Sequence, residues 1–136
     1  MSATSNAKIL KYSLGAGVIY FCCMATAHFF GFKVPLLFVY YDVPFYAYQD
    51  KIIAFAVVAY ICLFFAAARS LPAVPPALVA IWVTVLGLSA VNLSQALHSV
   101  LGDKSTLPYW AQTVLIAAYA LWLTVFFWRS RAQKSS

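Results

Sequence analysis

The stretch YSLGAGVIYFCCMATAHFFGF, Tyr12 to Phe32, contains no Asp, Glu, Lys or Arg. A helix needs about 20 residues to cross the roughly 30 Å hydrocarbon core of a bilayer, and this stretch is long enough. Its apolar run exceeds the roughly 7–15 residues of a signal-peptide core, and no small-x-small cleavage site ends it. We therefore predict a retained transmembrane helix here.

Three further apolar runs follow, and they begin near Ile52, Pro76 and Tyr109. The chain is 65% hydrophobic and 9% charged, whereas soluble domains carry roughly 25% charged residues. Backbone polar groups in lipid have to be paired within the segment, which leaves helices as the option for a chain of this size. We predict an all-α, polytopic integral membrane protein. It is a single bundle of four transmembrane helices, one domain over residues 1–136, with helices at about 12–32, 43–68, 76–101 and 108–128.

Charged residues are distributed unequally between the two ends of this bundle. One end has six basic residues and no acidic ones: Lys8, Lys11, Arg69, Arg129, Arg131 and Lys134. The other end has three of each: Lys33, Lys51 and Lys104 with Asp42, Asp50 and Asp103. The positive-inside rule then predicts that both termini are cytoplasmic. The brevity of the chain favours a bacterial inner membrane. Because the charges flank the spans, no basic patch is left for nucleic acid.

The connection between the first two helices, GFKVPLLFVYYDVPFYAYQDK (Gly31–Lys51), is aromatic and apolar rather than polar. Asp42 suits a helix N-cap, so the second helix is predicted to begin directly after it. From there Asp42, Tyr46, Gln49 and Asp50 recur at helical spacing as a polar stripe, with the Asp50 charge expected in water at the membrane surface. The preceding residues 33–42 are too few to span. We predict that they lie in the interface, as a lid or a docking surface.

Strongly polar side chains of the predicted spans gather toward the outer end of the bundle. Eight of them form the predicted ligand site: His28, Asp42, Tyr46, Asp50, Asn92, Gln95, His98 and Gln112. Gln95 and His98 are three residues apart and so share a face of the third helix. Mid-span Tyr20, Tyr60 and Tyr119 add hydroxyls inside the bundle. Such convergence is typical of a binding site in a helical bundle, although amides and imidazoles also join membrane helices structurally.

The chemistry of these residues leaves several ligands open. His28 and His98, at similar depth on two helices, are candidate axial ligands of a haem or another porphyrin. Aromatic walls with hydroxyl and amide groups also suit a quinone, a pigment or a lipid. A metal hydrolase would use both histidines with Asp42 and Asp50, but no local motif such as HExxH supports it. No ionisable side chain is predicted near mid-membrane, which argues against proton-coupled transport.

The three cysteines, Cys22, Cys23 and Cys62, all fall inside predicted spans. They lack the CxxC spacing of redox motifs and zinc sites. We interpret them as small packing residues.

The sequence predicts three classes of function. No catalytic motif is evident, and the small size and apolar outer segment favour an accessory or scaffold subunit. Such a subunit packs in the lipid bilayer against a membrane-protein partner or a second copy of itself. The alternative is a haem-, pigment-, quinone- or lipid-binding protein with its site at the outer end, built on His28, His98, Gln95 and Asp50. A membrane enzyme or small transporter is the second alternative.

Overall fold

The computed structural model describes residues 3–32 and 46–132, and within these ranges every regular element is a helix. In chain order these are α1 (Ala3–Phe30), α2 (Tyr46–Arg69), the 3₁₀ helix η1 (Leu71–Ala73), α3 (Val74–Asn92), α4 (Gln95–Leu101) and α5 (Leu107–Ala132). Four of them, α1, α2, α3 and α5, are long and apolar enough to cross a membrane, so the predicted all-α fold with four spans is confirmed. The apolar segment predicted at 33–42, Asp42 and the start of the second helix lie outside the described residues.

The end of α1 is set by a glycine. Gly31 has a φ of +74°, in the left-handed region that favours residues without a Cβ. The backbone N–H of Phe32 donates to the carbonyl of Ala27 at 2.8 Å, the six-to-one hydrogen bond of a Schellman motif. The helix therefore ends at Phe30, just before the predicted end at 32, and it begins at Ala3, nine residues earlier than expected.

Prolines set the turn between α2 and α3. Ser70 is extended, Pro72 lies in η1, and Pro75 and Pro76 occupy the first turn of α3. Proline is suited to a first helical turn because the N–H that it lacks would have no intrahelical partner there. This connection is as tight as the sequence predicted.

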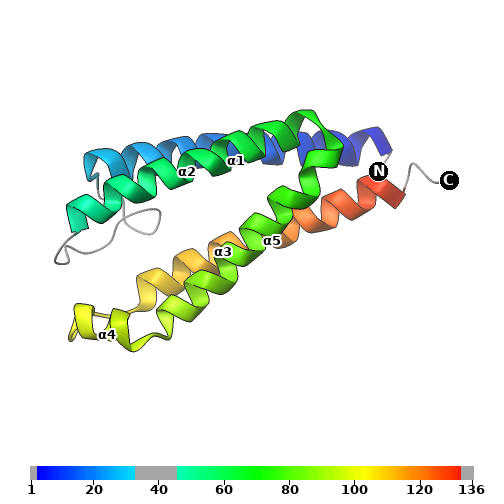
Figure 1. Cartoon of the computed structure of the whole chain (residues 1–136). Helices are drawn as coiled ribbons and strands as arrows, with labels where there is room; N and C mark the ends of the chain where they lie inside the picture. The colour runs from blue at the N-terminus through cyan, green and yellow to red at the C-terminus, as the bar shows by residue number, and fades with distance from the viewer. Residues whose placement is uncertain (1–2, 33–45, 133–136) are drawn as a thin grey trace.

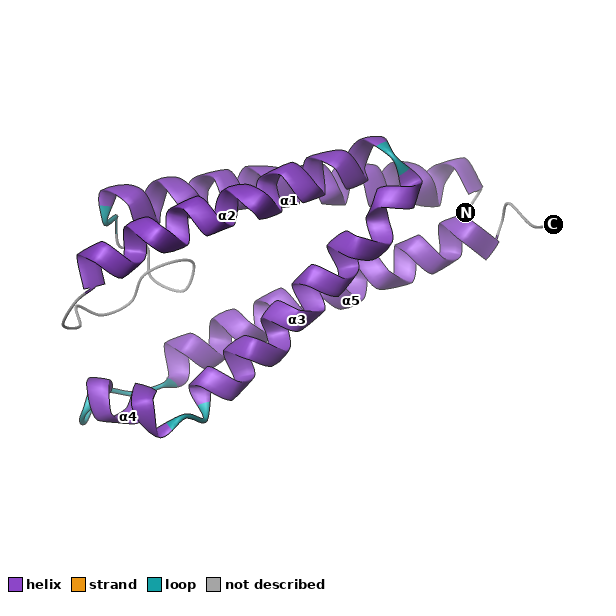
Figure 2. Ribbon diagram, in the orientation of Figure 1, coloured by secondary structure: helices purple, strands orange, loops and turns teal. Residues whose placement is uncertain are grey.

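The predicted helix at 76–101 is wrong in its last third. It is divided into α3 and α4, because the chain leaves the helix after Asn92 and Ser94 is extended, with φ −76° and ψ 142°. The Ser94 hydroxyl accepts a hydrogen bond from the N–H of Leu97 at 3.2 Å and so caps α4. A side-chain oxygen that competes with helix hydrogen bonds ends one helix and begins another. Figure 2 shows α4 as a separate short helix between two turns.

The four long helices form two antiparallel hairpins, α1 with α2 and α3 with α5 (Figure 1). The hairpins meet at the end where both termini lie, which we call the terminal end, and they diverge toward the other, which we call the open end. Buried apolar side chains from all four helices fill the junction near the terminal end. Among them are Leu10, Leu14, Phe64, Ala67, Val74, Ala77, Ile81, Ala120, Leu123 and Phe127.

Close contacts hold α1 against α2 and against α5. A Cβ built on Gly17 would lie 2.8 Å from Cδ1 of Phe64 and against the hydroxyl of Tyr119, so only glycine fits. Tyr119 donates its hydroxyl hydrogen to the carbonyl of Ser13 at 2.8 Å, and the Trp122 indole donates to the Ser13 hydroxyl at 3.0 Å. The junction is therefore packed closely enough to fix where the divergence begins.

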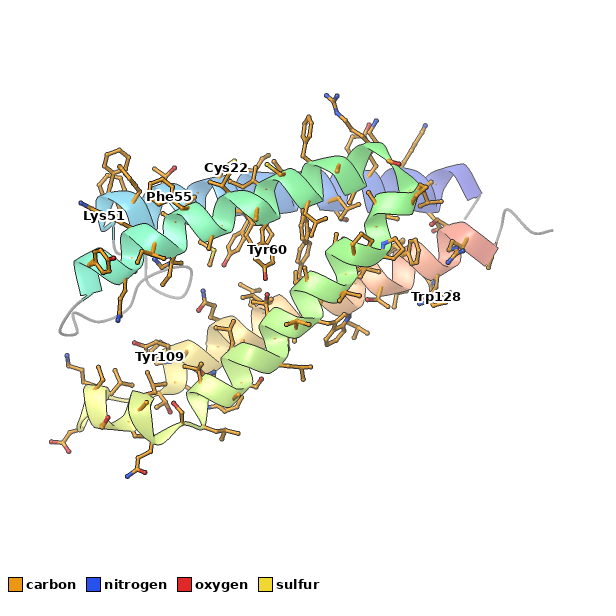
Figure 3. The ribbon with its side chains drawn as sticks, in the orientation of Figure 1. Cys22, Lys51, Phe55, Tyr60, Tyr109 and Trp128 are labelled. Atoms are coloured by element: carbon orange, nitrogen blue, oxygen red, sulfur yellow. The ribbon has the colours of Figure 1, made fainter. Side chains whose placement is uncertain are left out.

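The cysteines do not lie in this core, contrary to the prediction that they are buried packing residues. Cys22, Cys23 and Cys62 are all exposed on the outer surface of the helices. Figure 3 shows Cys22 on the side of the α1–α2 hairpin that faces away from α3 and α5. The spans therefore present these thiols to lipid or to a neighbouring protein.

Candidate ligand-binding site

A cavity of about 410 Å³ lies between the diverging hairpins. Its walls are mainly apolar, with Phe21, Met24, Ile53, Val57, Leu88 and Ile116 among them. A smaller set of polar side chains shares the lining: His28, Gln49, Asp50, Tyr60, Thr84, Asn92, Tyr109 and Gln112. Figure 3 shows Tyr60 extending from α2 toward the α3–α5 hairpin. An apolar cavity with a few convergent polar groups is the usual form of a small-molecule site.

A buried hydrogen-bonded pair, His28 with Asp50, forms part of the wall. Nδ1 of His28 lies 2.8 Å from Oδ1 of Asp50, joining the last turn of α1 to the beginning of α2. The residues are 8% and 4% exposed. A buried carboxylate is costly unless it is paired and hydrogen-bonded, so the imidazole explains how Asp50 can be there. The sequence-based expectation that the Asp50 charge would be in water at the membrane surface is wrong.

Among the described residues, the remaining ring nitrogen of His28 has no hydrogen-bond partner. An ionised Asp50 only accepts hydrogen bonds, so Nδ1 carries the hydrogen and donates it. Within the described residues the ring makes no hydrogen bond other than the one to Asp50. The carboxylate thus fixes both the tautomer and the orientation of the imidazole, because the hydrogen bond made by one ring nitrogen determines the state of the other.

The opposite wall of the cavity carries two amides. Nδ2 of Asn92 donates to the hydroxyl of Thr113 at 2.9 Å, and that hydroxyl in turn donates to the carbonyl of Tyr109 at 2.9 Å. Thr113 has one hydroxyl hydrogen and uses it on Tyr109, so it can only accept from Asn92. The orientation of the Asn92 amide is therefore fixed, and its Oδ1 has no hydrogen-bond partner among the described residues. Gln112, also buried, is hydrogen-bonded to Tyr20.

A hydroxyl pair lies deeper in the cavity, where α2 faces α3. The hydroxyl oxygens of Tyr60 and Thr84 are 2.6 Å apart, and Thr84 donates to the carbonyl of Ala80 at 2.9 Å. Since Thr84 has only one hydroxyl hydrogen, Tyr60 is the donor in this pair. The lone pairs of the Tyr60 oxygen are left facing the cavity.

The structure brings together half of the eight residues predicted for the site. His28, Asp50, Asn92 and Gln112 line the cavity. Gln95 and His98 lie on α4, are exposed, and do not line it, because the break at Ser94 separates them from α3. Tyr46 is the first residue of α2. Its side chain, like Asp42, lies outside the described part of the structure.

Sequence reasoning missed Thr84, Gln49 and Tyr109 as wall residues. Thr84 gives no signal, because a threonine inside a membrane helix usually bonds to the carbonyl four residues earlier, as this one also does. A tyrosine at the end of a span, such as Tyr109, is typical of an anchor at the membrane interface and so does not indicate a cavity wall. Gln49 belongs to the polar stripe predicted with Asp50, but it is not among the eight predicted site residues.

The two histidines do not share a cavity. His28 lines the cavity and His98 is exposed on α4, so the arrangement does not support a haem held between them. Among residues 3–32 and 46–132, no three His, Cys, Asp or Glu side chains gather as a metal site would require. The donor set that the described residues present is one imidazole with amides and hydroxyls, which suits hydrogen bonding to an organic ligand.

Comparison with known proteins gives no further assignment. The chain matches no family model, no curated protein and no solved structure.

Proposed function

We propose that the protein binds a small amphipathic molecule from the membrane in the cavity between its two hairpins. The buried His28–Asp50 pair in the cavity wall carries this proposal. A buried carboxylate in a membrane protein is costly unless it is paired, and such residues usually mark a pathway or a ligand site. Helix packing alone does not need such a pair, since apolar residues of similar volume often replace buried ion pairs without loss of stability.

The size and lining of the cavity support the same proposal. About 410 Å³ falls within the roughly 300–1,000 Å³ range of small-molecule pockets. The cavity lies between four helices that reach the membrane, so a ligand dissolved in the bilayer can enter between the hairpins without passing through water. This function corresponds to the quinone-, pigment- or lipid-binding alternative predicted from the sequence.

The proposal is tested by identifying what co-purifies. Protein purified in a mild detergent is extracted with organic solvent, and the extract is analysed by mass spectrometry. We expect one compound at close to one molecule per chain in the wild type. The same amount is expected in His98→Ala, which changes the exposed histidine, and a large loss in the double variant His28→Leu/Asp50→Leu, which removes the pair without leaving a lone charge. Equal amounts in all three proteins would contradict the proposal.

The accessory-subunit function predicted from the sequence is the second candidate. Only 22% of the residues in the most apolar part of α2 are buried against the rest of the protein. Most of the surface of α2 is therefore left for lipid or a neighbouring membrane protein. Elution of the purified protein with a fixed protein partner, together with an extract free of any bound compound, would favour this candidate over ligand binding. Enzyme or transport activity stays a prediction from the sequence.

A further inference from the structure

A second cavity, of about 250 Å³, lies against the first and extends toward the terminal end. It runs between α1 and α5, and its lining is almost wholly apolar, with Ala16 and Leu115 among the wall residues. Tyr119 lines it too, but its hydroxyl is engaged with the carbonyl of Ser13, so it presents its ring. We call this second cavity the apolar groove.

The two cavities are adjacent and share part of their lining. Phe21, Ile81 and Ile116 line both of them, one residue from each of α1, α3 and α5. A molecule held by its polar part beside His28 and Asn92 would therefore find an apolar path along α1 and α5, inward from the open end. A cavity with polar groups in its wall, next to an apolar groove, suits a ligand with one head group and one chain.

The hydrogen bonds that the polar wall residues already make indicate which head group the first cavity suits. His28 donates from Nδ1 to Asp50, and the neutral ring then presents Nε2 as an acceptor. Asn92 donates to Thr113 and Tyr60 donates to Thr84, so among the described residues the Asn92 Oδ1 and the lone pairs of the Tyr60 oxygen have no partner. These three groups therefore offer acceptors to the cavity. A head group that donates hydrogen bonds complements this part of the wall.

We infer that the ligand is a single-chain amphipathic phenol or alcohol, whose hydroxyl groups donate to His28 and Asn92 and whose chain lies in the apolar groove. An isoprenoid quinol has this chemistry, whereas the corresponding quinone, with only carbonyl oxygens, does not. Sites built to pair a ligand hydroxyl discriminate strongly against an analogue that cannot make that bond, because their own buried polar groups are left unpaired. The inference rests on the proposed function and narrows it to one class of ligand.

The head-group part is tested with decylubiquinol and decylubiquinone, which share a chain and differ in the two hydroxyl hydrogens. Binding to the purified wild-type protein is measured anaerobically by titration calorimetry. We expect the quinol to bind at least about tenfold more tightly, as the gain of one or two hydrogen bonds implies. Tyr60→Phe, which removes one acceptor and keeps the ring, should reduce this preference several-fold. Equal affinities of the two compounds for the wild type would overturn the assignment of a donating head group.

The chain part is tested with Ala16→Phe, which places a ring in the apolar groove. Ile19→Phe is the control, since Ile19 is 67% exposed on the same helix and does not line the groove. Decylubiquinol should bind several-fold more weakly to Ala16→Phe and unchanged to Ile19→Phe. A chainless hydroquinone should bind both variants equally. A decylubiquinol affinity that Ala16→Phe leaves intact would show that the chain lies elsewhere.

Failure of this inference and failure of the proposed function give different results. A bound compound in the solvent extract that lacks a hydroxyl group, lost in His28→Leu/Asp50→Leu, would keep the proposed function and remove the inference. An empty extract, together with no measurable binding of either probe, would remove both.

Discussion

His28 and Asp50 stand 22 residues apart in the sequence and join the two open-end termini of the α1–α2 hairpin with one buried hydrogen bond. The pair is built so that each residue needs the other. The carboxylate could not be buried alone, and the imidazole would have no fixed tautomer without it. This interdependence gives the first prediction, because His28 and Asp50 should not contribute additively to the free energy of unfolding.

Removing one partner should therefore destabilise the protein more than removing both. His28→Leu leaves Asp50 as an unpaired buried acid, a change that typically costs about 3–5 kcal/mol. The double variant His28→Leu/Asp50→Leu should unfold close to the wild type. The measurement is a double-mutant cycle of unfolding free energies in detergent or bicelles. Additive losses in the double variant would mean that the pair is solvated and not buried.

Gly17 gives the second prediction. Gly17→Ala should lower the unfolding free energy by about 1–3 kcal/mol, because its Cβ would meet the Phe64 ring and the Tyr119 hydroxyl. Gly87→Ala is the matched control. It lies within α3, nothing lies within 4 Å of its Cβ, and alanine is the better helix former by roughly 0.5–1 kcal/mol. In thermal unfolding, Gly17→Ala should lower the stability of the protein and Gly87→Ala should raise it. Equal changes in the two variants would contradict close packing at the junction.

The spans were predictable because hydropathy reports what lipid requires of each segment. The turn at Pro72 was also readable from local residues, whereas the helix predicted at 12–32 ran through Gly31, where the positive φ ends α1. The break before α4 was not readable either. The apolar run continues through Leu93, and whether Ser94 caps a new helix depends on one hydrogen bond that hydropathy does not register.

The candidate site was only partly predictable for a related reason. The depth of a residue along its span can be read from the sequence, and this depth grouped His28, Asp50, Asn92 and Gln112. The direction in which α4 leaves α3 could not be read, so His98 was placed with them wrongly. The divergence of the hairpins, which creates the cavity, depends on packing between them such as the contact of Gly17 with Tyr119, and no single segment encodes it.

Ser94 gives the third prediction. Ser94→Ala should destabilise α4 by about 0.5–2 kcal/mol, the usual cost of losing an N-cap side chain. Hydrogen exchange of backbone amides in 95–101 should speed up, with Leu97 most affected because its N–H is the capped donor. Ser99→Ala is the control, since the Ser99 hydroxyl only donates to the carbonyl of Ala96. Faster exchange that spreads through α3 as well would show that α3 and α4 behave as one helix.

The orientation of the protein gives the last prediction. Four spans place both termini on one side of the membrane, and Figure 1 shows both at the terminal end. That end carries basic residues without acids, among them Lys11, Arg69 and Arg131, so it should stay in the cytoplasm. A reporter active only outside the cytoplasm should be silent when fused after Ser136 and active when inserted after Asp103, between α4 and α5. Activity at Ser136 and silence at Asp103 would invert the topology, and the cavity would then open toward the cytoplasm.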